Sequence, residues 1–185
     1  MNWGGPQWGW CALLRGATAG VVLVGIFWAQ PYRLAINTTA SEPEGWYLTR
    51  RLDSGAPLRR GELVVMRYAG PAVAKYRAVA PYPAGTEFIK RIAGIPGDKL
   101  DTSGRHVALT TPEGRTVSLG ILLAQSPSGK PVPTPAPWRN THIPGGHYYL
   151  AATDIQTAFD SRYFGLVPRQ RILAEAWPIR TWKGP

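Results

Sequence analysis

The chain has 185 residues, of which 44% are apolar, enough for one globular domain with one appended segment and too few for a second full domain. Its formal net charge is +10, and a single cysteine, Cys11, excludes an intrachain disulfide. The three histidines, His106, His142 and His147, lack the spacing of metal ligands, so we expect no metal and no other cofactor.

The first predicted element is an apolar segment near the amino terminus. Residues 16–32 carry no charge and would span roughly 26 Å as a helix, a little less than the ~30 Å hydrocarbon core of a bilayer. Extending the helix back past Arg15, whose side chain can snorkel, supplies the missing length. Aromatic residues such as Trp8 and Trp28 lie towards its two ends, as they do in membrane spans.

Two other interpretations of this segment are a cleavable signal peptide and a buried core helix. Cleavage is disfavoured because the small-residue triplet at 17–19 precedes the apolar stretch, whereas a cleavage site would follow it. We therefore predict a retained anchor over residues 1–32, followed by one folded domain over residues 33–185.

The remainder of the chain predicts short strands separated by turns, and helix-length periodicity is weak after Ala29. The predicted strands cover 47–52, 62–67, 87–94, 106–110, 116–119, 146–152 and 172–179. Residues 111–114, Thr-Pro-Glu-Gly, are typical of a hairpin turn. Residues 126–137 are rich in proline, which cannot donate to a sheet, so they should form an exposed loop. The fold class is mainly β, an antiparallel domain with one amino-terminal transmembrane helix.

Two residues suggest a chemistry. Lys90 lies in a strand-like apolar run that ends in Pro-Gly-Asp, and burial there would lower its pKa towards neutrality. Ser41 lies in a loop rich in hydroxyl groups, and a neutral lysine is a recognised base for a serine nucleophile. The alternatives are a plain turn around Ser41 and a lysine whose ammonium group snorkels to solvent.

Together with a third segment around Asp160, these boxes make the chain resemble the bacterial type I signal peptidases. Within that superfamily it is most similar to the TraF-type peptidases of conjugative transfer systems. The boxes are Thr-Ala-Ser-Glu-Pro at 39–43, Arg-Gly-Glu-Leu-Val-Val at 60–65, Lys-Arg through Pro-Gly-Asp at 90–98, and Asp-Ser-Arg at 160–162. The resemblance implies a signal-peptidase-like β fold.

The resemblance also implies roles for individual residues. Ser41 would be the nucleophile and Lys90 the general base. Thr39, two positions before the nucleophile, would add its hydroxyl to an oxyanion hole; the alternative is a threonine that only caps the loop. Asp160 and Arg162 would support the strand that carries the lysine.

The chain departs from the family pattern at three places. Glu42 stands where signal peptidases usually have methionine, and Ala-Thr-Asp at 152–154 stands where many have Gly-Asp-Asn. Ala158 occupies the position of a serine that binds the lysine in many relatives, so Thr157 or a water would have to replace it. The substrate contacts are therefore expected to differ from those of the family.

The predicted function is a membrane-anchored serine endopeptidase that processes exported precursors, in particular a conjugative pilin precursor, with cyclisation as one outcome. The protein is expected in the cytoplasmic membrane with a single span and its domain in the periplasm. The charge flanking the segment, with Arg33, Arg50 and Arg51 after it, favours the opposite orientation, and here we follow the family.

The partners expected from charge are anionic lipids, because nearly all of the positive charge follows the anchor and no nucleic-acid-binding signature accompanies it. The alternative functions are a general signal peptidase I and a non-catalytic envelope assembly protein. A self-cleaving regulator shares the Ser-Lys chemistry, but no DNA-binding domain is present.

Overall fold

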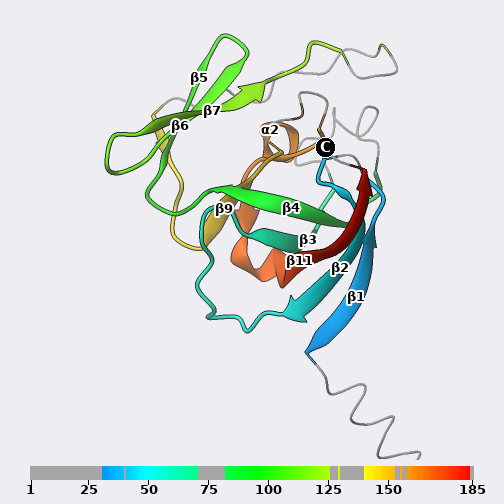
Figure 1. Cartoon of the computed structure of the whole chain (residues 1–185). Coiled ribbons are helices and arrows are strands. Elements are labelled where there is room, and N and C mark those ends of the chain that lie inside the picture. Colours follow the sequence, from blue (N-terminus) through cyan, green and yellow to red (C-terminus); the bar gives the residue numbers. More distant parts are fainter. Residues whose placement is uncertain are drawn as a thin grey trace, which may run out of the picture. The chain divides into compact units, whose positions relative to one another are not determined.

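A computed structural model of the protein describes residues 31–39, 41–70, 82–125, 129, 140–152, 155 and 158–183 (Figure 1). The chain divides into two compact units, Met1–Arg33 and Leu34–Pro185. Apart from its last two residues, the predicted membrane segment lies outside the described residues, as does the proline-rich loop apart from Gly129. Within the described ranges, no helix has the length and apolar character that crossing a bilayer requires.

Two antiparallel sheets make up the domain. The seven-stranded sheet has the order β1-β2-β11-β3-β4-β9-β10, and the four-stranded sheet has the order β7-β6-β5-β8. The strands of the first are β1 (Tyr32–Asn37), β2 (Glu44–Arg51), β11 (Ile172–Lys183), β3 (Leu63–Arg67), β4 (Glu87–Gly94), β9 (His147–Leu150) and β10 (Val167–Pro168). Those of the second are β7 (Thr116–Ile121), β6 (His106–Thr110), β5 (Lys99–Ser103) and β8 (Thr141–His142). The predicted mainly β, antiparallel fold is confirmed.

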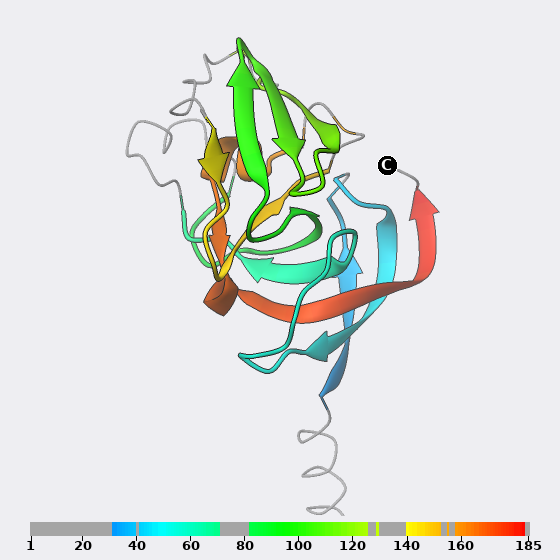
Figure 2. The same cartoon turned by 90° about the vertical axis from the view of Figure 1, so that its left-hand side faces the viewer.

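Within the described residues there are two short helical segments, α2 (Ser161–Phe164) and the 3-10 turn η2 (Arg169–Arg171). Figure 2 shows the four-stranded sheet at one end of the seven-stranded sheet.

Each of the seven predicted strands overlaps a strand of the structure, and β4 and β6 have the predicted bounds. The predicted hairpin is present, because β6 and β7 pair antiparallel with Thr110 opposite Thr116, on either side of the turn at 111–114. Strands β1 and β5 and the two-residue strands β8 and β10 were not predicted. In β5 only Leu100 is fully buried, so its residues show no regular apolar alternation.

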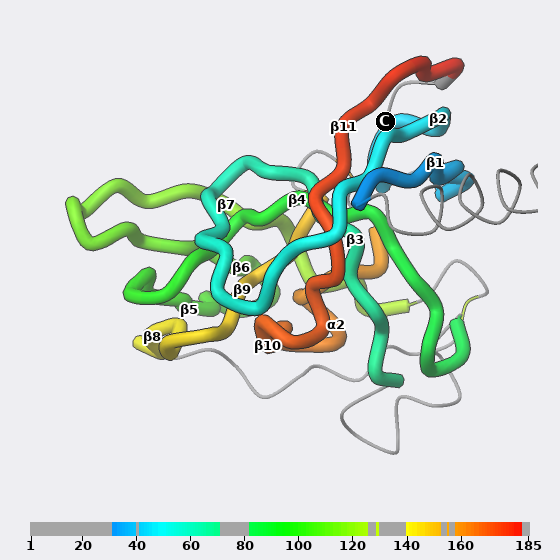
Figure 3. Tube along the Cα trace, turned by 90° about the horizontal axis from the view of Figure 1, so that it is seen from below, coloured from blue at the N-terminus to red at the C-terminus, as the bar shows by residue number. Residues whose placement is uncertain are grey.

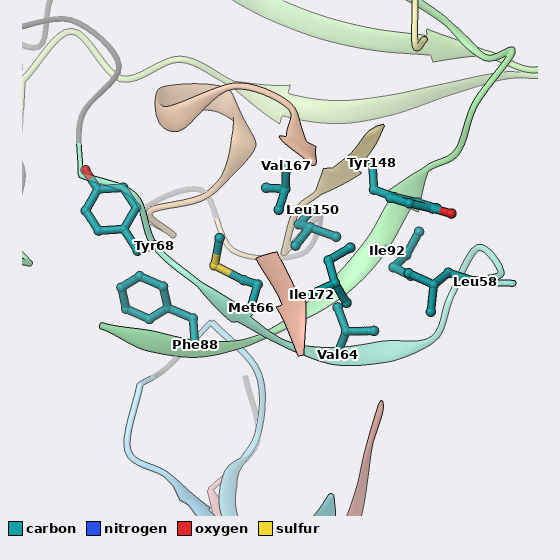
Figure 4. Close-up of a cluster of buried hydrophobic side chains, with 10 residues drawn as sticks. All are labelled: Leu58, Val64, Met66, Tyr68, Phe88, Ile92, Tyr148, Leu150, Val167 and Ile172. Carbon is teal, nitrogen blue, oxygen red and sulfur yellow. The ribbon is translucent and has the colours of Figure 1, made fainter. Parts of the chain in front are cut away.

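The core of the large sheet forms on the face where alternate residues of the paired strands meet. In the β3–β4 pair, Val64 lies opposite Lys90 and Met66 opposite Phe88. Side chains of opposite residues share one face of the sheet. The cluster on this face is shown in Figure 4 and contains Leu58, Val64, Met66, Tyr68, Phe88, Ile92, Tyr148, Leu150, Val167 and Ile172.

Strand β11 connects the two halves of the large sheet. It pairs along most of its length with β2 and, through its first residues, also with β3. Figure 3 shows β11 running between β2 and β3. Pro178 interrupts the ladder with β2, where the register shifts between Pro178 and Arg180, because proline has no N–H to donate.

Candidate active site

Ser41 lies in the loop between β1 and β2, and Lys90 lies in the middle of β4. The two side chains meet, with Lys90 Nζ 2.5 Å from Ser41 Oγ. Lys90 is 2% exposed and Ser41 is 8% exposed. The fold thus brings together two residues that are 49 positions apart in the sequence. It places the lysine amine where it can take the serine proton.

The surroundings of Lys90 favour its neutral form. Burial lowers its pKa from 10.5 to about 8. The carboxylates of Asp160 and Glu42 oppose this shift, and the guanidinium of Arg162 adds to it. The Phe88 ring lies 5.5 Å from Nζ, on the same apolar strand. At a slightly alkaline pH the amine is therefore about half neutral, and so available as a base.

Thr39 lies beside the nucleophile. Its hydroxyl oxygen is 3.4 Å from Ser41 Oγ, and the hydroxyl donates a 2.8 Å hydrogen bond to the side-chain oxygen of Asn37. A hydroxyl in this place is close enough to reach an oxygen of a substrate attacked by Ser41. Its role as an oxyanion donor stays a prediction.

Asn37 and Tyr47 hold the serine loop, and the sequence analysis did not identify either of them. The Asn37 amide donates to the carbonyl oxygens of Thr39, Glu42 and Pro43, at 3.0, 2.8 and 3.2 Å. The Tyr47 hydroxyl donates to the Pro43 carbonyl at 2.6 Å. The sequence offered only a general cue, because an asparagine side chain often bonds the backbone two residues further on, which indicates a turn but no role in a site.

Glu42 points away from solvent although it is charged. Its carboxylate accepts a 3.0 Å hydrogen bond from Arg91, which follows the lysine in β4. Arg91 also donates to the carbonyl of Gly61 at 2.9 Å. Glu42, which replaces the methionine usual at this position, therefore has a charged partner in Arg91, on the strand that carries Lys90.

Asp160 and Arg162 form a fully buried ion pair at 2.8 Å. Asp160 caps helix α2, since its side chain accepts from the backbone N–H of Arg162. It also accepts from the N–H of Ala152, while the Ser161 hydroxyl accepts from the N–H of Leu150. These bonds fix the end of β9, which pairs with β4 through Leu150 and Ile92.

The Asp160–Arg162 ion pair thus lies one strand away from Lys90. The negative charge of Asp160 raises the pKa of Lys90. The supporting role predicted for Asp160 and Arg162 stays a prediction. Ala158 lies against this pair, where its carbonyl accepts from Arg162 at 3.3 Å. Thr157, the expected substitute for the missing serine, lies outside the described residues.

No group of histidine, cysteine, aspartate and glutamate side chains in the described part of the chain could hold a metal ion. The chemistry available at the site is that of a hydroxyl, an amine and hydrogen-bond donors. This set is sufficient for acyl transfer to a serine.

Comparison with known proteins connects this site to a family. The profile described as "Signal peptidase, peptidase S26" matches residues 7–181. The "Plasmid transfer protein TraF" of Escherichia coli is 28% identical over 177 residues, which cover 90% of this chain and 93% of that protein. The "Conjugal transfer protein TraF" of Agrobacterium tumefaciens is 30% identical, over 82% of this chain and 83% of that protein.

A "Probable signal peptidase I-2" of Synechocystis is 29% identical over 126 residues, which cover 68% of this chain and 49% of that protein. The signal peptidase profile spans nearly the whole chain, including the loop of Ser41 and the strand of Lys90. The resemblance to TraF proteins that was predicted from the sequence is confirmed. The chain belongs to the signal peptidase family, peptidase S26.

Proposed function

We propose that the protein is a membrane-anchored serine endopeptidase that uses Ser41 as nucleophile and Lys90 as general base. The observation that carries this proposal is the 2.5 Å contact between Ser41 Oγ and the amine of a buried lysine whose pKa is lowered to about 8. Such an amine can accept a proton near neutral pH, which an ordinary lysine cannot do.

In the proposed reaction, neutral Lys90 takes the proton of Ser41 as Oγ attacks the scissile carbonyl. The negative charge that develops on the carbonyl oxygen is bound by the Ser41 backbone N–H and the Thr39 hydroxyl. The tetrahedral adduct then collapses, the C–N bond breaks, and the ammonium of Lys90 returns its proton to the leaving amine. The acyl group remains as an ester on Ser41, from which water or an amine releases it.

The proposed substrate is an exported precursor that reaches the enzyme from the membrane, in particular a conjugative pilin precursor. The relatives named plasmid or conjugal transfer protein support this choice, because each matches most of this chain. Glu42, paired with Arg91 beside the nucleophile, also supports a dedicated substrate. If an amine of the same precursor attacks the ester, the product is cyclic.

The proposed location is the cytoplasmic membrane, with one span over residues 16–32 and the domain in the periplasm. The positive charge of the chain supports contact with anionic lipid. Exposed aromatic side chains on β2 and β11, Trp46, Trp177 and Trp182, support contact with the membrane interface.

General removal of signal peptides is the second candidate, supported by the similarity to a probable signal peptidase I. Mass spectrometry of a processed pilin-like subunit separates the two. A product one water lighter than the linear trimmed chain and without a free amino terminus supports dedicated maturation with cyclisation. Processing of many unrelated preproteins supports the general role.

The proposed activity is tested with Ser41→Ala and Lys90→Met, with Ser54→Ala at an exposed turn as the matched control. Each of the first two should abolish processing of a co-expressed precursor, and the double variant should be no worse than either, because the two residues act as a unit. Near-full processing by Ser41→Ala would show that the proposal is wrong.

A further inference from the structure

Asn37 is the last residue of β1 and is 4% exposed, and its side chain forms hydrogen bonds to the loop that carries Ser41. Its amide donates to three carbonyl oxygens, one before the nucleophile and two after it. Its oxygen accepts from both the N–H and the hydroxyl of Thr39. One side chain therefore ties down the backbone on both sides of Ser41.

We propose that Asn37 is a positioning residue for catalysis, which fixes Ser41 against Lys90 and orients the Thr39 hydroxyl. The inference rests on the proposed function. The hydrogen bonds of Asn37 go to Thr39, Glu42 and Pro43, so it acts through the residues that it holds.

The geometry of the loop shows what Asn37 contributes to Ser41. The carbonyl oxygens of Glu42 and Pro43 need hydrogen-bond donors. The loop has one backbone donor fewer, because Pro43 has no N–H. Asn37 supplies a donor to both, and the Tyr47 hydroxyl supplies a second to Pro43. Without Asn37 the loop would have to turn these carbonyls elsewhere. Ser41 would then move away from the amine that it contacts at 2.5 Å.

The second contribution concerns the single proton of the Thr39 hydroxyl. In the resting site this proton points to the Asn37 side-chain oxygen at 2.8 Å, while Ser41 Oγ lies 3.4 Å from the same hydroxyl oxygen. Asn37 therefore keeps this proton away from Ser41 Oγ, so that it does not occupy a lone pair needed for the attack. When negative charge appears on the substrate oxygen, the hydroxyl can rotate towards it, because Thr39 Oγ1 is already in place.

The test compares Asn37→Ala and Asn37→Asp with the wild-type protein, as full-length chains in detergent. The aspartate keeps an acceptor oxygen and removes the amide donors, so it isolates the bonds to the three carbonyls. The control is Leu109→Val in the core of the four-stranded sheet, which loosens the fold at a distance from the site. The midpoint of thermal unfolding, measured for each variant, shows how far the substitution destabilises the fold.

Two measurements are made on each folded variant. The first is kcat and KM on a fluorogenic peptide with an Ala-x-Ala cleavage site, the small-residue pattern of signal peptides. The second is a ¹³C NMR titration of the Lys90 side chain, which needs no substrate and is assigned by the signal missing from Lys90→Met.

For Asn37→Ala we expect a kcat about 100-fold lower with KM changed less than about three-fold, because a displacement of the nucleophile of about 1 Å suffices for this loss. We also expect the Lys90 pKa to rise from about 8 towards 10.5, since a loosened loop admits water. Asn37→Asp should lose kcat as well, and Leu109→Val should change neither quantity. The loss from Asn37→Ala should also be smaller in a Thr39→Ala background, because part of the effect passes through Thr39.

The inference is wrong if folded Asn37→Ala or Asn37→Asp keeps kcat within about three-fold of the wild type, since that rate excludes a misplaced nucleophile. An unchanged Lys90 titration in both variants contradicts it as well, even when no peptide is cleaved. Failure of the proposed function gives a different result: Ser41→Ala then cleaves the peptide as well as the wild type does, or neither protein cleaves it. If Asn37→Ala does not fold, Asn37→Asp decides the outcome by the same two measurements.

Discussion

Glu42 and Arg91 form an ion pair at 3.0 Å, one position beyond Ser41 and Lys90 on the same two segments. The reactive contact and the ion pair therefore join the serine loop to β4 at adjacent points. The carboxylate of Glu42 is buried and raises the pKa of Lys90, against the larger effect of burial. Residue 42 thus influences the base as well as the shape of the loop.

We expect cleavage to rise with pH through a limb near pH 8, where Lys90 loses its proton, and to persist at alkaline pH. In Glu42→Gln the limb should move to lower pH, because a negative charge that favours the ammonium form is removed. The matched control is Glu87→Gln. Glu87 is exposed at the start of β4, the strand that carries Lys90, and its substitution should leave the pH of the limb unchanged. A limb that moves to higher pH in Glu42→Gln would contradict this account.

The stability of Lys90→Met should exceed that of the wild type below pH 8. The native lysine loses its proton at about 8 and the unfolded one at 10.5, so the buried ammonium costs about 3 kcal/mol at low pH. Between these two values the unfolded state binds more protons, and wild-type stability rises with pH. The advantage of Lys90→Met should therefore be largest below pH 8 and vanish above pH 10.5.

Denaturant unfolding at a series of pH values measures this difference. Lys99→Met on β5, at a partly exposed position, is the control and should show no comparable gain. A wild type that is as stable as Lys90→Met at pH 7 would mean that the amine is solvated.

Arg162→Met should destabilise the domain by about 3–5 kcal/mol, because it leaves the fully buried carboxylate of Asp160 without its charged partner. The double variant Asp160→Asn with Arg162→Met should lose less than the sum of the two single changes. The control is Arg67→Met, whose partner Glu87 is exposed, and it should cost about 1 kcal/mol or less. Additive losses in the double variant would show that the two residues are independent.

A chain that begins at Arg33 should leave the membrane fraction in high salt, whereas the full-length chain should resist alkaline extraction. The difference follows from removing the apolar segment 16–32 while keeping the basic domain. Protease added to spheroplasts should digest the domain. Protection from protease would instead support the orientation favoured by the flanking charges.

Much of the fold could be predicted because β4 is a mostly apolar run and β6 alternates between buried and partly exposed residues, each next to a clear turn. Strand β1 was not predicted although Tyr32, Leu34 and Ile36 alternate along it as in a strand, and the structure leaves these side chains 47%, 65% and 51% exposed. The burial of Arg162 could not be predicted from its residue type, because arginine is seldom buried without a partner.

At the site, the sequence indicated Ser41 and Lys90 by motif and by the apolar run around the lysine. It did not indicate Asn37, because the role of that side chain lies in bonds to backbone carbonyls, which carry no residue identity. The same holds for Tyr47, whose hydroxyl also binds a carbonyl. Residues that organise a loop through its backbone are visible only once the loop has a conformation.

The position of strand β11 has a consequence for the order in which the candidate site forms. The strand that follows Ser41 and the strand that carries Lys90 are not neighbours: in the sheet the order is β2, β11, β3, β4. The last strand of the chain therefore fills the place between the two halves of the site. During synthesis the serine and the lysine leave the ribosome long before residues 172–183, and contacts so distant in sequence form slowly. Under the proposed function, we therefore expect the nascent chain to be inactive until β11 has been made and inserted into the sheet.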